Sequence, residues 1–467
     1  MVETIELAEY ETRFSRAQPT TDDERLADRL SAHGDASARL DVRWLANNRV
    51  EIRASSWVGV VRFSGFEVRI VPKLAGGALR VLQMIEYTDG VRLLTHLPRE
   101  QQLPADGNDL FELVVMALIH ATRSLIRDGL IRDYRPIDDT LTVMRGRLRM
   151  RDQFLRRYGS FHRLECHFDE YDGNIPENQL LAASLAASAT CVRHDGLRTD
   201  ARILAGQLAD ICEPPTRDPE WYFQRIHDNR RNERYKPAHE LARLVLNGLA
   251  FSDLASPSSQ RVTAFMFNMN TLFERFVTRL VKDSLDGSRL RVVAQSGFGS
   301  IIIDDATNNT YSEVRPDLVV VDTESGDRTP VDIKYKLYDA KKLGTADIYQ
   351  LFTYAYAIGS GEHPRQAGLI YASTTSITGP ALRIKAAAGS TGARIYGAGI
   401  DVPGILDALG ALDPAPVYAK IRSVIQQVTG LTSPATHPAA PSHAPPPAPG
   451  SAASTPCTAA PDAPGSA

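Results

Sequence analysis

Apolar and polar residues alternate along residues 49–73, where Gly59 and Gly65 supply turn signals. This period of two predicts a small antiparallel β-meander. Further along, apolar residues recur at helical spacing in four segments, which predicts a mainly helical region after the β-rich N-terminal part. The predicted helices cover residues 77–87, 109–126, 178–189 and 237–248.

From residue 268 onward, helix and strand patterns mix. Asn270 is placed to cap a helix whose apolar stripe includes Leu272, Phe276 and Leu280. Six short apolar runs and one amphipathic helix follow, an order that predicts a sheet flanked by helices. The predicted strands are residues 291–295, 317–321, 330–335, 368–371, 382–386 and 393–396, and the helix is 346–358.

We therefore expect a multidomain α+β protein, in which an N-terminal β-meander and a helical region precede an α/β domain. The predicted divisions are a β-rich domain at residues 1–105, a mainly helical region at 106–254, the α/β domain at 255–432 and a tail at 433–467. The tail is rich in Pro and Ala and has almost no large apolar residue, so it is predicted to be disordered.

Composition narrows the class of protein. The chain has 467 residues, 43% hydrophobic and 23% charged, and its 53 Lys and Arg against 56 Asp and Glu argue against coating nucleic acid by bulk charge. No apolar run reaches the roughly 18–20 residues of a membrane span, and the N-terminus lacks a signal-peptide pattern, so a cytoplasmic protein without membrane contact is expected. The four cysteines form no CxxC pair, which argues against zinc, iron–sulfur and disulfide frameworks.

Carboxylates on two consecutive predicted strands are the first candidates for chemistry. Asp317 and Asp332 lie fifteen residues apart across a turn-like segment, so on a hairpin they can lie side by side and share one cation. Lys334 leaves the same face as Asp332, while Ile333 points into the core and its backbone carbonyl can serve the metal. Mg²⁺ prefers hard oxygen ligands, and an ammonium beside it can position or activate the water that attacks a phosphodiester.

Three residues on flanking helices extend this pattern. Glu274 lies on the preceding predicted helix, and Gln350 and Tyr354 lie one turn apart on the following one, so both can face the site. A polar rim on an amphipathic helix is the alternative explanation for Gln350 and Tyr354. Asp-x-Lys also occurs by chance in many proteins, so the order helix, strand, strand, helix is what makes the set informative.

Together these positions resemble the motif of the PD-(D/E)xK nuclease superfamily in its QxxxY branch. The matching residues are Glu274, Pro316, Asp317, Asp332, Lys334, Gln350 and Tyr354. Longer blocks that agree in order and spacing narrow the resemblance to McrC, the nuclease subunit of McrBC modification-dependent restriction systems. These blocks are MRGRLRMRDQF at 144–154, CHFDEYDGNIPENQLL at 166–181, FMFNMNTLFERFV at 265–277 and VDIKYK at 331–336.

The resemblance implies a Mg²⁺-dependent endonuclease subunit of a type IV restriction system, acting on 5-methylcytosine-containing double-stranded DNA. It implies a restriction-endonuclease-like domain at 255–432 and a partner-docking role for 106–254. The implied partner is a McrB-like AAA+ GTPase, a hexameric ring whose GTP hydrolysis the chain stimulates. Because this sequence has no G-x-x-x-x-G-K-[ST] loop, GTP is expected on the partner.

Four arginines alternate with other residues inside the first block. They are Arg145, Arg147, Arg149 and Arg151. A strand here would present a row of guanidinium groups to a phosphate backbone or to an acidic groove on the partner. An edge strand protected from aggregation by its charge explains the same row equally well.

Two other functions stay open from the sequence: a non-catalytic activator of the GTPase, and a stand-alone DNA repair nuclease. The intact Asp317, Asp332 and Lys334 argue against the first. About half of the chain lies outside the predicted nuclease domain, which argues against the second.

Overall fold

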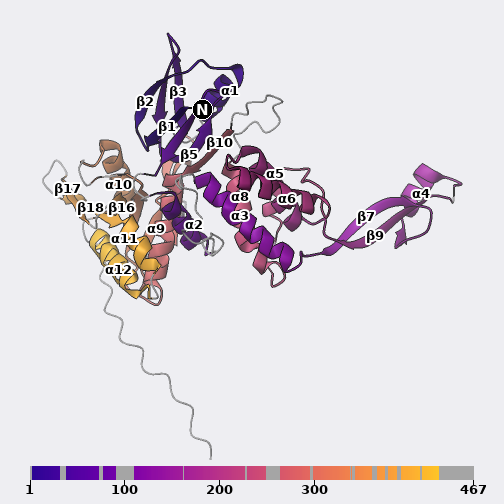
Figure 1. Ribbon diagram of the computed structural model, residues 1–467. Coiled ribbons are helices and arrows are strands. Elements are labelled where there is room, and N and C mark those ends of the chain that lie inside the picture. Colours follow the sequence, from indigo (N-terminus) through magenta and orange to yellow (C-terminus); the bar gives the residue numbers. More distant parts are fainter. Residues whose placement is uncertain are drawn as a thin grey trace, which may run out of the picture.

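The computed structural model describes residues 3–430 except for short internal segments. These exceptions are residues 32–37, 73–76, 91–109, 161, 227–228, 249–262, 295–297, 337, 339–341, 360–364, 374–376, 386–390 and 411–412. The predicted tail at 433–467 lies outside the described residues. Figure 1 shows a mixed α/β protein with several sheets: N-terminal strands at the top, a group of helices with a narrow arm on one side, and a helix-flanked sheet on the other.

The N-terminal strands form two sheets rather than the single predicted meander. The elements are β1 (Glu3–Ala8), β2 (Thr12–Arg16), α1 (Thr21–Ser31), β3 (Leu40–Leu45), β4 (Arg49–Ala54), β5 (Trp57–Arg62) and β6 (Phe66–Val71). One sheet has the order β2-β4-β3 and the other has the order β1-β6-β5-β10. The meander over residues 49–73 is confirmed in its second half, because β5 and β6 pair antiparallel, and wrong in its first half, because β4 pairs with β2 and β3 in the other sheet.

The last strand of the second sheet comes from far along the chain. β10 (Thr263–Asn268) runs antiparallel to β5, with Met266 opposite Gly59. A Cβ atom at Gly59 would lie 2.0 Å from the backbone oxygen of Phe265, and the φ of Gly59 is +142°. The predicted domain boundary at residue 255 falls outside the described residues, and the strand that follows it belongs to the N-terminal sheet.

The middle of the chain is helical, as predicted. Its helices are α2 (Ala78–Asp89), α3 (Leu110–Arg127), α5 (Pro176–Cys191), α6 (Asp195–Ala209), α7 (Pro219–Phe223), the 3₁₀ turn η3 (Glu233–Tyr235) and α8 (Lys236–Gly248). The four helices predicted from apolar spacing are confirmed to within a few residues. α3 buries residues around most of its circumference, which makes it the centre of this group.

An arm that the sequence analysis did not predict extends from these helices (Figure 1). It consists of β7 (Asp133–Leu141), β8 (Arg147–Leu148), α4 (Met150–Arg157) and β9 (Leu164–Asp172). β9 pairs with both β7 and β8. The arm places α4 at its far end, away from every other helix in the view.

The C-terminal region is a six-stranded sheet with helices on both faces. Its elements are α9 (Met269–Leu285), β11 (Leu290–Ala294), β12 (Phe298–Asp304), β13 (Asn309–Val314), β14 (Leu318–Asp322), β15 (Arg328–Lys334), α10 (Thr345–Ile358), β16 (Arg365–Ser373), β17 (Ile377–Lys385), β18 (Thr391–Asp401), α11 (Val402–Leu409) and α12 (Ala415–Thr429). The strand order is β11-β14-β15-β16-β18-β17, and β12 and β13 form a separate hairpin.

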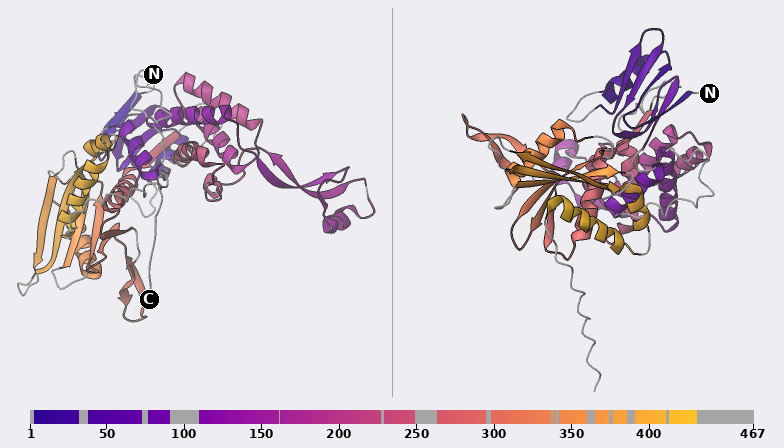
Figure 2. Two further views of the ribbon diagram at one scale, coloured as in Figure 1. Left: turned by 90° about the horizontal axis from the view of Figure 1, so that it is seen from below. Right: turned by 90° about the vertical axis from the view of Figure 1, so that its left-hand side faces the viewer.

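The two faces of this sheet have separate cores. Residues of α9 and α12 share one core with Val331, Ile333 and Ile370, whereas residues of α10 share another with Leu369 and Tyr371. This alternation along β15 and β16 is the expected period of two, and the left view of Figure 2 shows the sheet between its helices.

Two smaller findings complete the fold. Asn268 caps α9, because its side chain accepts hydrogen bonds from the backbone N–H groups of Asn270 and Thr271; the predicted cap at Asn270 is wrong by two residues. Among the described residues, no helix combines the length and the apolar character that crossing a membrane requires.

The close approach of β5 and β10 yields a stability prediction. Gly59→Ala should destabilise the protein by about 1–3 kcal/mol, because a Cβ atom there meets the backbone of β10 in a conformation that L side chains rarely adopt. The matched control is Gly65→Ala, where no heavy atom lies within 4 Å of the added Cβ. Thermal melting of both variants is the measurement, and equal melting temperatures would contradict the close contact.

Candidate active site

The register of β14 and β15 brings the two predicted carboxylates together. Leu318 lies opposite Val331, so the next residue on each strand places Asp317 beside Asp332. Asp317 Oδ2 accepts a hydrogen bond from the backbone N–H of Ile333 at 2.6 Å. Within a strand the N–H and C=O of one residue point to the same side, so the Ile333 carbonyl faces the space beside Asp317.

Lys334 completes this strand end. Its Nζ lies 3.0 Å from Asp332 Oδ2, and both side chains leave one face of β15 while Ile333 packs in the core on the other. Asp332 is buried and Lys334 is half-buried. The predicted shared face of Asp332 and Lys334 is therefore confirmed by the ion pair.

Helix α10 supplies Gln350 and Tyr354 to the same place. Gln350 Nε2 lies 3.5 Å from Asp332 Oδ1 and donates to the Tyr354 hydroxyl at 2.8 Å. That hydroxyl donates to the backbone carbonyl of Arg315 at 3.0 Å, just before Asp317. The two residues thus join the helix to both carboxylate-bearing segments, which a polar rim facing solvent would not do.

Glu274, on α9, approaches from the other flanking helix. Its negative charge contributes to raising the pKa of Asp317, which places it within electrostatic range of the two aspartates. The structure therefore gathers Asp317, Asp332, Lys334, Gln350 and Tyr354 around the ends of β14 and β15, and the charge of Glu274 acts on Asp317.

Burial and like charge dominate the electrostatics. Burial, followed by the charges of Asp332 and Glu274, raises the pKa of Asp317 to about 8. Burial also raises the pKa of Asp332, even though Lys334 opposes the shift. Burial acts to lower the pKa of Lys334, but the Asp332 carboxylate outweighs it and raises that pKa overall. A divalent cation stabilises two adjacent carboxylates of this kind, one buried and one half-buried.

The donor set fits a hard cation that keeps part of its water shell. Within the described residues, no three His, Cys, Asp or Glu side chains form a ready-made metal group. The site offers two carboxylates and the Ile333 carbonyl, all oxygen donors, and Asp332 Oδ2 is fully buried beside the Lys334 ammonium. Mg²⁺ is commonly bound by one or two carboxylates with waters in its remaining positions.

Two further contacts at the site were missed by the sequence analysis. Asp347, in the first turn of α10, accepts a hydrogen bond from the Tyr338 hydroxyl at 2.5 Å and lies 3.4 Å from Lys336 Nζ. Its position three residues before Gln350 was an available signal, since both share a helix face. Tyr335 donates to Glu9 Oε2 at 3.2 Å, a buried contact that no local pattern could reveal.

The four arginines of the first block lie elsewhere, on the arm (Figure 1). The predicted strand with a continuous guanidinium row is wrong, because β8 ends at Leu148, Arg149 precedes α4 and Arg151 lies within it. Arg145 stacks over the Phe168 ring and pairs with Glu170. Arg149 pairs with Asp138 and Asp152, and no ion pair involving Arg147 or Arg151 occurs among the described residues.

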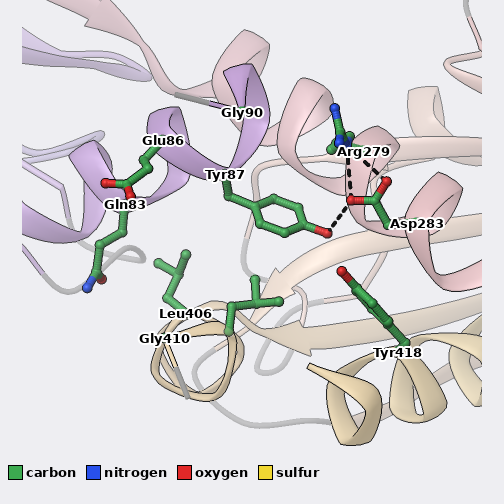
Figure 3. Close-up of a pocket in the computed structure, with 10 residues that line it drawn as sticks. Gln83, Glu86, Tyr87, Gly90, Arg279, Asp283, Leu406, Gly410 and Tyr418 are labelled. Carbon is green, nitrogen blue, oxygen red and sulfur yellow. Dashed lines mark hydrogen bonds and ion pairs between the residues drawn. The ribbon is translucent and has the colours of Figure 1, made fainter. Parts of the chain in front are cut away.

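A cavity of about 410 Å³ between α2, α9, α11 and α12 contains none of these residues (Figure 3). Asp283 accepts hydrogen bonds there from the Tyr87 hydroxyl at 2.8 Å and from Arg279 Nε at 2.9 Å. Burial, followed by hydrogen bonds with Asp283 and Tyr418, raises the pKa of Tyr87, so its hydroxyl stays protonated. The contact fastens α2 to α9.

The raised pKa of Asp317 gives a pH prediction. Since the folded state binds this proton more tightly than the unfolded state, the contribution to stability is full below the ordinary Asp pKa and is lost as the pH rises towards 8. In EDTA, wild-type melting temperature should fall between pH 5 and pH 8, and Asp317→Asn should remove most of that fall. The control is Asp305→Asn, which changes an exposed carboxylate and should keep the wild-type fall in melting temperature. If the melting temperature of Asp317→Asn falls as much as that of this control, the assignment is contradicted.

Comparison with known proteins supplies the family. Residues 52–372 match the family model described as McrBC 5-methylcytosine restriction system component, while no curated protein matches. One similar solved structure is the refined half-complex from a tetradecameric assembly of Thermococcus gammatolerans McrB AAA+ hexamers with bound McrC, at 19% identity and a TM-score of 0.57, covering 89% of this chain and 98% of that chain. Another is the cryo-EM structure of the Thermococcus gammatolerans McrBC complex, at 20% identity and a TM-score of 0.41, covering 61% and 89%. At 19% identity the first of these structures supports the fold alone, whereas the family model spans more than half of the sequence. The chain therefore belongs to the McrBC 5-methylcytosine restriction system component family, and the McrC resemblance of its sequence blocks is confirmed.

Proposed function

We propose that this chain is the Mg²⁺-dependent DNA endonuclease subunit of a GTP-dependent, modification-dependent restriction system. The observation that carries the proposal is the convergence of Asp317, Asp332 and Lys334 at the ends of two neighbouring strands. Its substrate would be methylated double-stranded DNA, in keeping with the 5-methylcytosine restriction of the family. It would act in the cytoplasm.

The side chains divide the work of phosphodiester hydrolysis. Asp317, Asp332 and the Ile333 carbonyl would hold the cation, which when bound stabilises negative charge on the scissile phosphate. The Lys334 ammonium, fixed by Asp332, positions the attacking water beside that phosphate. Gln350 and Tyr354 keep Asp332 and the segment before Asp317 in register with each other.

The proposed partner is a McrB-like AAA+ GTPase hexamer that binds GTP and delivers DNA. In the similar structure from Thermococcus gammatolerans, McrC is bound to McrB hexamers. The arm of this chain provides a suitable docking element, because its far end exposes large apolar side chains that a monomer has no reason to leave in water. These are Val143, Met144, Met150, Phe154, Leu155 and Tyr158.

The two alternatives are less well supported. A non-catalytic activator does not need two adjacent, largely desolvated carboxylates, which are costly unless a cation or proton neutralises them. A stand-alone nuclease does not need an arm with an exposed apolar tip.

Asp332→Ala should reduce DNA cleavage by about a thousandfold, because it removes one carboxylate of the metal site. The same variant should fold and stimulate the GTPase as the wild type does, since Asp332 lies in a different region from the arm. The measurements are cleavage of methylated duplex with Mg²⁺, GTP and the partner, and GTP turnover. Asp305→Ala, an exposed carboxylate on the β12–β13 turn, is the control. Full cleavage by Asp332→Ala would refute the assignment.

The arm gives a separate prediction about the partner. Phe154→Ala with Leu155→Ala should weaken GTPase stimulation about tenfold or more, because exposed apolar anchors carry most of the binding energy of an interface. The control is Ile203→Ala, a comparably exposed apolar side chain on α6. Unchanged stimulation by the double variant over a full concentration series would show that docking occurs elsewhere.

A further inference from the structure

The outer face of the three-stranded N-terminal sheet is a surface without an assigned role. Strand register sets its nine outward positions in three rows across β2, β4 and β3. Opposite side chains in such rows share one face. The rows are Thr12, Arg53 and Asp41; Phe14, Glu51 and Arg43; and Arg16, Arg49 and Leu45. The opposite face of β4 is buried through Val50, Ile52 and Ala54, so the central strand presents only one face to solvent.

Arginine dominates that outer face. Four of the nine positions are Arg and two are acidic, in a chain whose net charge is −3. Arg43 pairs with Asp41 at 2.9 Å. Within the described part of the chain, Arg16, Arg49 and Arg53 make no ion pair with a carboxylate, so their charge is available to a ligand.

An exposed aromatic ring and a groove accompany these arginines. Phe14 is 56% exposed, and the Arg49 guanidinium lies 5.5 Å from its ring centroid. A groove of about 510 Å³ is lined by Glu3, Phe14, Ser15, Arg16 and Arg49. Guanidinium groups held beside an aromatic plane are well arranged for a phosphate-bearing ligand.

We propose that this face binds the phosphate backbone of double-stranded DNA, so that the subunit binds its substrate independently of the partner. The inference rests on the proposed function for the identity of the substrate, but it concerns a surface remote in sequence from the metal site. Phosphate contacts from Arg supply sequence-independent affinity, which suits a subunit that must follow DNA wherever cutting occurs.

DNA fits this face better than a protein partner does. Phe14 and Leu45 are its only large apolar side chains among the nine outward positions, whereas protein interfaces concentrate apolar anchors at their centre. The arm tip shows the contrasting composition, with six exposed apolar side chains. The two surfaces therefore offer the chain one contact for protein and one for DNA.

The test is the binding of a fluorescently labelled duplex by the full-length chain, followed by anisotropy in EDTA so that no cleavage occurs. The variant combines Arg16→Gln, Arg49→Gln and Arg53→Gln, which keeps long polar side chains and removes three charges. Binding at low salt should weaken at least about tenfold, and the slope of log affinity against log salt should become shallower by about 2–3. The charge-matched control combines Arg13→Gln, Arg25→Gln and Arg29→Gln, which removes three exposed arginines of the same region that lie away from this face.

Melting temperatures show whether the triple variant is folded, and Phe14→Ala provides a second variant at the same groove, with a smaller loss expected. Affinity and salt slope equal to wild type in the folded triple variant would overturn the proposal. So would intact duplex binding together with weakened binding of the GTPase partner. If the chain binds duplex through this face but never cuts DNA, the nuclease function alone is refuted. If the triple variant binds and cuts DNA as the wild type does, the DNA-binding role of this face alone is refuted.

Discussion

Two aspartates held side by side, one buried and one half-buried, constrain the rest of the C-terminal region. The antiparallel register of β14 and β15 sets Asp317 against Asp332 one residue beyond the last strand pair. Their mutual repulsion adds to the cost of burial, so neighbours must hold the pair in place: the Ile333 N–H, the Lys334 ammonium and the Gln350 amide. Each of these is positioned by a different connection in the sheet or in α10. The surrounding fold thus supplies the contacts that hold two mutually repelling carboxylates side by side.

The N-terminal region is part of that structure. β10 completes the N-terminal sheet and leads directly into α9, the helix that carries Glu274. Tyr87 of α2 bonds to Asp283 at the other end of α9, and Glu9 receives the hydroxyl of Tyr335, the residue after Lys334. Movement of the N-terminal region would therefore displace both α9 and the end of β15, which carry site residues. This offers a direct physical route by which a partner could influence cutting.

Sequence reasoning predicted features whose cause is local. The spacing of Asp317 and Asp332 across one turn, and the face shared by Gln350 and Tyr354, follow from strand and helix periods, and the structure shows both arrangements. The division of the meander and the pairing of β5 with β10 depend on residues about two hundred positions apart, which no local pattern encodes. The arm was missed because β7 exposes most of its residues and so lacks the apolar alternation that marks a half-buried strand.

The pairing of β5 with β10 also has a consequence for how the chain is made. On the ribosome, β5 emerges long before β10, since roughly 200 residues separate Arg62 from Thr263. At synthesis rates of about 5–20 residues per second, the edge of β5 waits about ten to forty seconds for its partner. An apolar strand with an open edge is a site for pairing with other chains. Nascent molecules of this protein should therefore depend on chaperones during that interval, and crowded polysomes should be where its misfolding begins.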